Sequence, residues 1–172
     1  MRRHIVLIGL PGAGKTTVGR LIAEDLGVSF IDTDGIVVRR MQMPIARIFA
    51  TMGEEKFREM EREAMASALI GPPSVIAPGG GWAAQPAQLE TARPSCFVVY
   101  LRTMAMTAAK RATGEGTRPL LVGEDPVEKM RQLLKEREPY YLGAECEVKC
   151  DVRTPAQIAE EVVTLAREHA GW

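Results

Sequence analysis

A glycine-rich segment near the N-terminus carries the clearest chemical signal in the chain. Gly9-Leu10-Pro11-Gly12-Ala13-Gly14-Lys15-Thr16 fits the pattern G-x-x-x-x-G-K-[ST] without a gap, between an apolar run and an amphipathic stretch. Glycines let backbone N–H groups turn toward a phosphate, and the start of a following helix adds positive potential. Lys15 can reach the terminal phosphates of a nucleotide, and the Thr16 hydroxyl can ligate Mg²⁺. We therefore expect a nucleotide-phosphate site made of Gly12, Ala13, Gly14, Lys15, Thr16 and Thr17.

Two acidic residues, Asp32 and Asp34, follow the second apolar run of the chain. In an extended chain these two positions point the same way, so both carboxylates can serve one site. Asp32 can hold Mg²⁺ through water while Asp34 faces an acceptor hydroxyl. The alternative is that Asp34 caps the helix that begins after it, a role that is compatible with catalysis.

Apolar runs that alternate with helical periodicity must position these residues. Strands are expected at 5–9, 29–32, 74–77, 96–101 and 147–151. Helices are expected at 15–26, 54–69, from about 104, at 126–138 and at 155–169, with two short helices between 34 and 52 divided at Pro44. This alternation predicts an α/β fold with a parallel sheet, and residues 1–172 are expected to form one domain.

The composition limits the classes of partner. The 172 residues carry 22 basic and 22 acidic side chains, so the formal net charge is zero and favours neither nucleic acid nor a membrane surface. No apolar run approaches the ~20 residues that span a bilayer. We expect a cytoplasmic monomer that acts on a small molecule.

The cysteines and histidines show no metal-ligand spacing. Cys146 and Cys150 lie in one expected strand, about 13 Å apart, which is too far for a disulfide. His4 and His169 stand near opposite ends of the chain. We expect buried thiols and surface histidines.

Motifs elsewhere in the sequence, present or absent, indicate which class of nucleotide-binding protein carries this glycine-rich segment. The sequence has no N-K-x-D segment for guanine and no hydrophobic run ending in aspartate after the third expected strand. These features argue against a GTPase switch and a motor ATPase, and they leave the small-molecule kinases.

Five motifs that follow the glycine-rich segment in one order make the prediction more specific. The segment Gly9 to Thr17 is followed by Asp32-Thr33-Asp34, Phe57-Arg58, Gly79-Gly80-Gly81, Arg118-Pro119-Leu120-Leu121 and Arg137. Along essentially the full chain this order resembles the shikimate kinase family. The resemblance implies a P-loop NTPase-type, nucleoside-monophosphate-kinase-like fold with a five-stranded parallel sheet flanked by helices. It also implies a substrate-binding helical region at about 33–61 and a mobile lid at about 113–123.

The resemblance further implies an activity and a role for each matching residue. The family transfers the γ-phosphate of ATP, with Mg²⁺, to the 3-hydroxyl of shikimate in the pathway to chorismate and aromatic amino acids. By this likeness Asp34 contacts the hydroxyl, Asp32 serves the metal, and Lys15 and Arg118 act on the phosphates. The likeness also implies that shikimate is bound by Arg58, Gly80, Gly81 and Arg137, and that Glu61 orients Arg58. It further implies that Arg111 and Arg153 flank adenine. Guanidinium forks suit a small carboxylate substrate.

Two alternative functions stay open, and two stretches of the sequence depart from the pattern expected for the family. The chain could phosphorylate another sugar acid such as gluconate, or it could be a catalytically silent nucleotide-binding regulator. Trp82 follows the triple glycine where a small residue is commoner, and we expect it to narrow the pocket or reshape its rim. The stretch 143–146 lacks the further basic residues that are often found there.

Overall fold

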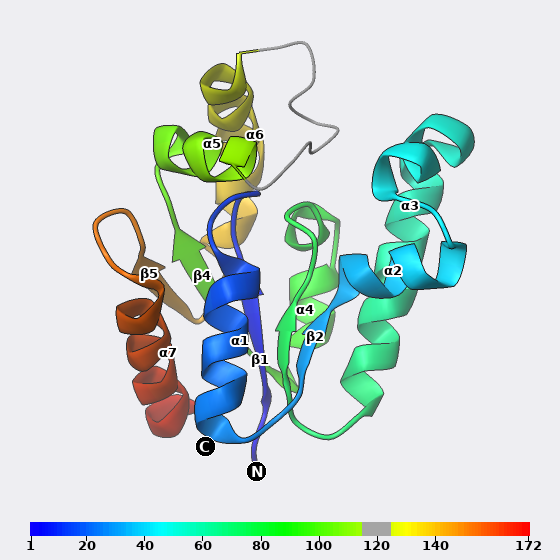
Figure 1. Ribbon diagram of the computed structural model, residues 1–172. Coiled ribbons are helices and arrows are strands. Elements are labelled where there is room, and N and C mark those ends of the chain that lie inside the picture. Colours follow the sequence, from blue (N-terminus) through cyan, green and yellow to red (C-terminus); the bar gives the residue numbers. More distant parts are fainter. Residues whose placement is uncertain (115–124) are drawn as a thin grey trace.

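A computed structural model describes residues 1–114 and 125–172. Its centre is a parallel sheet with the strand order β2-β3-β1-β4-β5, as Figure 1 shows. The strands are β1 (His4–Ile8), β2 (Phe30–Asp32), β3 (Val75–Ala77), β4 (Cys96–Arg102) and β5 (Cys146–Lys149). The predicted five-stranded parallel sheet is therefore confirmed.

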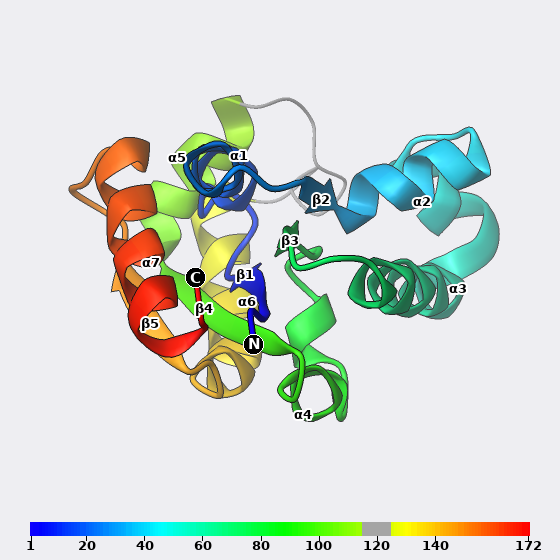
Figure 2. The ribbon, with the colours of Figure 1, turned by 90° about the horizontal axis from the view of Figure 1, so that it is seen from below.

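Helices cover both faces of the sheet, which explains why its central strands read as continuous apolar runs. Ile5 and Leu7 of β1 pack toward α1 (Lys15–Leu26) and α7 (Pro155–His169). Val6 and Ile8 pack toward the other face, where the core includes residues of α4 (Gln88–Ala92), α5 (Ala105–Gly114) and α6 (Pro126–Tyr141). Figure 2 shows α1 and α7 on one side of the sheet and α4 on the other.

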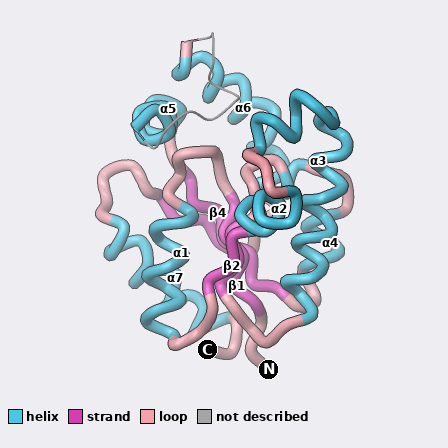
Figure 3. Tube along the Cα trace, turned by 45° about the vertical axis from the view of Figure 1, so that its right-hand side comes forward, coloured by secondary structure: helices cyan, strands magenta, loops and turns pink. Residues whose placement is uncertain are grey.

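A helical region stands beside the β2 edge of the sheet (Figures 1 and 3). It consists of α2 (Thr33–Met41) and the first part of α3 (Ile45–Ile70), and the predicted division at Pro44 is confirmed. Gly53, with φ 82° and ψ 168°, interrupts α3 and turns its first two turns away from the rest. Val37 and Ile48 of this region form a small core with Phe57 and Ala64, which belong to the second part of α3.

Several local features differ from the prediction. A 3₁₀ turn (Trp82–Ala84) and α4 were not expected. Helix α6 continues through Pro139 to Tyr141, beyond the expected end at 138. Trp82 is 1% exposed and belongs to the main core. It was expected to narrow the pocket or reshape its rim, but it does not line the pocket. The turn over residues 79–82, closed by a hydrogen bond from the Trp82 N–H to the Gly79 carbonyl at 3.0 Å, carries the indole inward.

Neither stretch of described chain, 1–114 or 125–172, contains a helix with the length and apolarity needed to cross a membrane. The expected lid at about 113–123 falls outside the described residues, apart from Thr113 and Gly114 at the end of α5.

Candidate active site

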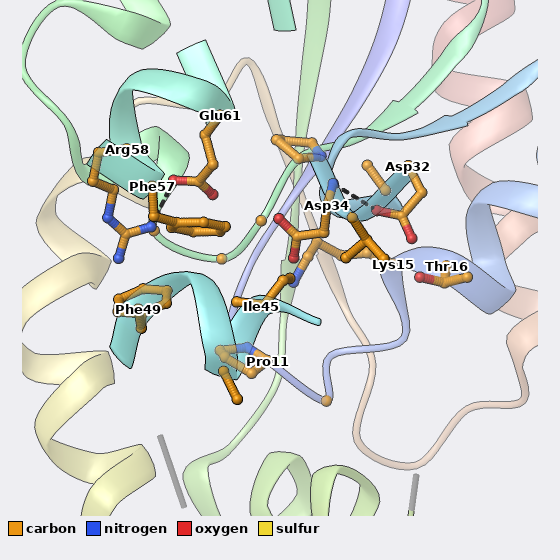
Figure 4. Close-up of a pocket in the computed structure, with 18 of the residues that line it drawn as sticks. Pro11, Lys15, Thr16, Asp32, Asp34, Ile45, Phe49, Phe57, Arg58 and Glu61 are labelled. Atoms are coloured by element: carbon orange, nitrogen blue, oxygen red, sulfur yellow. Dashed lines mark hydrogen bonds and ion pairs between the residues drawn. The ribbon is translucent and has the colours of Figure 1, made fainter. Parts of the chain in front are cut away.

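A cavity of about 660 Å³ opens where β1, β2 and β3 end, and Figure 4 shows the side chains around it. Ligands of open parallel sheets bind at the carboxyl ends of the strands. The chain segments that line the cavity come from the loop after β1, the start and middle of α2, the two parts of α3, the turn after β3, and α6. Motifs that are far apart in the sequence therefore meet at one place.

Residues 9–16, which comprise the loop after β1 and the first two residues of α1, form a cradle that is called the phosphate loop below. Gly12 and Gly14 have φ values of 81° and 93°, which favour glycine. A Cβ on Gly12 would lie 2.3 Å from the Ala108 carbonyl oxygen, so α5 packs directly against the loop. Gly14 is the N-cap of α1 and supplies no side-chain cap, so the first N–H groups of this helix suit an anion.

The side chains of the phosphate loop lie at or beside the cavity. The Lys15 Nζ donates to the Gly9 and Leu10 carbonyl oxygens at 2.8 Å each, and the side chain stays within the loop. Thr16 and Thr17 line the cavity, as do Gly12 and Gly14. Ala13 is buried, and its N–H donates to the Leu10 carbonyl at 3.1 Å. The fit is that of a polyphosphate cradle.

Asp32 and Asp34 both line the cavity, although not through the extended geometry that the spacing suggested. Strand β2 ends at Asp32, and α2 begins at Thr33. Asp32 Oδ1 accepts from the N–H groups of Asp34 at 3.0 Å and Gly35 at 3.3 Å, so Asp32 is the helix cap, and the alternative that Asp34 caps the helix is wrong. Figure 4 shows Asp32 on the side of Lys15 and Thr16, and Asp34 closer to the centre.

Arg58 is held by acids of its own helix. Its Nη1 donates to Glu61 Oε2 at 2.6 Å, and its Nη2 donates to Glu54 Oε1 at 3.1 Å. Glu61 is 1% exposed, and burial raises the pKa of its carboxyl, while Arg58 and then Arg137 act in the opposite direction. Arg58 is consequently a fixed, partly buried cation at the cavity wall rather than a solvated one.

The three glycines at 79–81, called the glycine segment, let charged groups approach the backbone. A Cβ on Gly81 would lie 2.6 Å from Arg58 Nη1, and one on Gly80 would lie 3.1 Å from Arg137 Nη1. One on Gly79 would lie 2.3 Å from Glu61 Oε1. None of the three has a positive φ, so glycine is needed here for space and not for backbone conformation.

An apolar wall completes the cavity and was not anticipated as part of the site. It consists of Val38, Ile45, Phe49 and Phe57. The rings of Phe49 and Phe57 pack with centroids 4.7 Å apart. The one-turn spacing of Ile45 and Phe49 on a short helix was the sequence signal for this wall. The ring that packs on Phe49 belongs to Phe57, which lies beyond the interruption at Gly53, in the next helical segment.

The two arginines expected at adenine do not line this cavity. Arg111 Nη2 donates to the Cys150 carbonyl at 3.3 Å, while Arg153 binds Glu161 and donates to the Gln157 carbonyl at 3.1 Å. Burial raises the pKa of the Cys150 thiol to about 11, and both cations oppose that rise. Both arginines therefore lie near the residue that directly follows β5. Arg118 lies outside the described residues.

The donor set suits magnesium better than a metal held by protein alone. Within residues 1–114 and 125–172, no three His, Cys, Asp or Glu side chains gather into a metal site. Mg²⁺ typically uses one or two protein ligands together with substrate phosphates and water. The Thr16 hydroxyl and the Asp32 carboxylate beside the phosphate loop match that chemistry.

Comparisons with known proteins identify the family. The family model described as shikimate kinase matches residues 11–167. A shikimate kinase from Moorella thermoacetica is 45% identical over 162 residues, which cover 94% of this chain and 93% of that one. The structure of a shikimate kinase from Acinetobacter baumannii in complex with shikimate superposes with a TM-score of 0.92 at 34% identity, covering 98% of this chain and 94% of that one.

A gluconokinase from Sinorhizobium meliloti also matches, with a TM-score of 0.64 at 20% identity, covering 99% of this chain and 94% of that one. That likeness shows a shared fold alone. The family model, the relatives and the arrangement of the cavity lead to one conclusion: this chain belongs to the shikimate kinase family.

Proposed function

We propose that the protein transfers the γ-phosphate of ATP to the 3-hydroxyl of shikimate. One observation carries the proposal: Arg58, Arg137 and the glycine segment open onto the same cavity as the phosphate loop and Asp34. Family membership supports the same activity. The cavity can therefore hold an anionic acceptor and a nucleotide phosphate side by side.

The acceptor is bound by its carboxylate and its ring. Arg58 and Arg137 are the cations of the cavity wall that suit a carboxylate, and charge-assisted bonds to guanidinium forks fix its orientation. The apolar wall suits one face of a carbocyclic ring. Much of the rate acceleration comes from this positioning, because it aligns the hydroxyl with the terminal phosphate.

Asp34 serves the reacting hydroxyl. It accepts a hydrogen bond from the 3-hydroxyl and takes its proton as the new O–P bond forms. The bond between the γ-phosphorus and the bridging oxygen breaks, and ADP leaves with the electron pair. A loose transition state requires little early deprotonation, so alignment by Asp34 matters before proton transfer does.

The phosphate loop and Lys15 neutralise the charge of the transferred group. Mg²⁺ would be held by Thr16 directly and by Asp32 through water, and it would offset the negative charge of the β- and γ-phosphates. The roles of Arg118 at the phosphates and of Arg111 and Arg153 at adenine are proposed from the sequence resemblance.

The apolar wall favours shikimate over the alternative substrate gluconate. Shikimate presents a cyclohexene ring beside its carboxylate, whereas gluconate is an open chain with a hydroxyl on each carbon. Burying hydroxyls against Ile45, Phe49 and Phe57 without partners costs free energy. A silent regulator is disfavoured because Lys15 and Asp34 both line the cavity.

A coupled assay of ADP release with shikimate, quinate and gluconate side by side tests the proposal. We expect release with shikimate, loss of release when EDTA removes Mg²⁺, and loss in a Lys15→Ala control that keeps its melting temperature. Mass spectrometry should show a singly phosphorylated acceptor. Equal turnover of gluconate, or ADP release that is independent of any acceptor, would contradict the proposal.

We also propose that the protein acts as a monomer in the cytoplasm. Light scattering coupled to size-exclusion chromatography measures the mass in solution, and 18.8 kDa is the expected value.

A further inference from the structure

Tyr141, the last residue of α6, makes a contact that the mechanism above does not use. Its phenol donates a hydrogen bond to the carbonyl oxygen of Gly80, in the middle of the glycine segment. The side chain is fully buried, and Tyr141 does not itself line the cavity. The contact joins the end of α6 to a backbone segment 61 residues away in the sequence.

The position of this phenol is set by the sheet. The ring of Tyr141 packs against that of Tyr100 on β4, with centroids 5.2 Å apart and planes inclined by 38°. The Tyr100 hydroxyl reaches Glu138 Oε1 at 3.4 Å, one turn before Tyr141 on α6. Burial raises the pKa of the Tyr141 phenol, although Arg137 beside it acts in the opposite direction, so the phenol keeps its proton and remains a donor.

Gly80 lies between the phosphate loop and the arginines proposed to bind the acceptor. A Cβ on Gly80 would lie 3.1 Å from Arg137 Nη1, 3.1 Å from Pro11 Cδ of the phosphate loop, and 3.3 Å from the Gly9 carbonyl oxygen. The Gly80 backbone thus fills the space between the phosphate loop and Arg137, one of the two arginines proposed to bind the carboxylate of the substrate. Because glycine has the widest choice of backbone conformation, contacts from outside the glycine segment must fix the backbone of Gly80.

We propose that Tyr141 is a positioning residue for the acceptor, which fixes the Gly80 carbonyl and thereby the spacing of Gly80, Gly81 and Arg137. The inference rests on the proposed function, because it assigns the glycine segment to the acceptor. Without the phenol O–H, the Gly80 carbonyl loses its buried donor, and the segment moves away from the geometry that suits the acceptor. The phosphate loop keeps its own hydrogen bonds.

The test is Tyr141→Phe, which removes one oxygen atom and keeps the ring against Tyr100. We expect the KM for shikimate to rise by about 10-fold, which corresponds to about 1.4 kcal/mol. The KM for ATP should change by less than about twofold, since the phosphate loop keeps its own hydrogen bonds. Isothermal titration with shikimate should show the same weakening without turnover.

Two matched variants separate positioning from packing. Tyr100→Phe removes the other hydroxyl of the same buried ring pair, and Tyr140→Phe makes the identical change at the exposed neighbour in sequence. Both should keep the KM for shikimate within about twofold of the wild-type value, whatever happens to the melting temperature.

Three outcomes would overturn the inference. A Tyr141→Phe enzyme with a lower melting temperature but an unchanged KM for shikimate would make the residue merely structural. An equal rise in KM in Tyr100→Phe would assign the effect to general packing. A wild-type protein that neither binds nor phosphorylates shikimate would instead refute the proposed function, and the inference with it.

Discussion

The carboxylates of Glu61 and Asp34 approach each other at Gly79. A methyl group on this glycine would lie 2.3 Å from Glu61 Oε1, 2.8 Å from Asp34 Oδ1 and 3.3 Å from Asp34 Oδ2. The two acids come from different helices, α3 and α2, and Arg58 and Arg137 offset the charge of Glu61. The glycine therefore lets two acids with different tasks share one wall of the cavity.

Gly79→Ala should damage activity far more than its size suggests. The new methyl group must displace Glu61, Asp34 or both, since a Cβ contact of 2.3 Å is not tolerated. We expect kcat/KM for shikimate to fall at least about 10²-fold, the scale set by a misplaced catalytic group. Gly71→Ala is the matched control, because a Cβ there meets nothing closer than 3.6 Å. Similar activity in the two variants would refute the steric role of Gly79.

Arg58→Ala should weaken shikimate binding and also destabilise the fold. Loss of its charge-assisted bonds should cost about 2–3 kcal/mol of binding, or about 30- to 150-fold in affinity. The fold suffers because Glu61, which is 1% exposed, is left as a buried charge without its closest partner. The double variant Arg58→Ala/Glu61→Gln should recover most of the melting temperature but none of the affinity. Recovery of both would show that Arg58 only neutralises Glu61.

Asp34→Asn should lower kcat by about 10²-fold or more, the scale of general-base contributions, with little change in ATP affinity. Stability should hold, because Asp32 and not Asp34 caps α2. Steady-state kinetics and nucleotide titration measure the two effects. Asp25→Asn, the same change in an exposed ion pair with Arg167, is the control and should leave kcat unaltered. Full-speed turnover in Asp34→Asn would remove Asp34 from the reaction.

Protonation of His4 should destabilise the protein in mild acid. Burial lowers the pKa of His4 from its ordinary 6.5, and its Nδ1 accepts from the Ser74 N–H at 3.3 Å, which requires an unprotonated nitrogen. A lowered folded-state pKa gives stability that is present above pH 6.5 and is lost as the pH falls through the folded-state value. Urea unfolding between about pH 5.5 and 8 should show a steeper loss for wild type than for His4→Gln. Identical slopes would contradict the assignment.

The sequence predicted the features that depend on local pattern. The five strands, the phosphate loop and α7 are each encoded by neighbouring residues, and their predicted positions agree with the structure to within a few residues. The order of motifs also identified most residues that line the cavity, from Thr16 to Arg137.

Features that depend on contacts between distant segments were not predictable. The cap of α2 required knowledge that β2 ends at Asp32, and the burial of Trp82 depends on the turn after Gly81. His4 was expected at the surface but is 4% exposed, because the first strand is central in the sheet. The apolar wall joins Phe49 and Phe57 across the interruption at Gly53.

The cavity is continuous, which bears on inhibitor design. Thr16 at the phosphate end and Arg58 at the acceptor end line one space of about 660 Å³. A bisubstrate compound that joins a carboxylate-bearing ring to a polyphosphate through a short tether can occupy both ends at once. Binding of the second end is then intramolecular, so such a compound should bind more tightly than either fragment by orders of magnitude when the tether length matches the span.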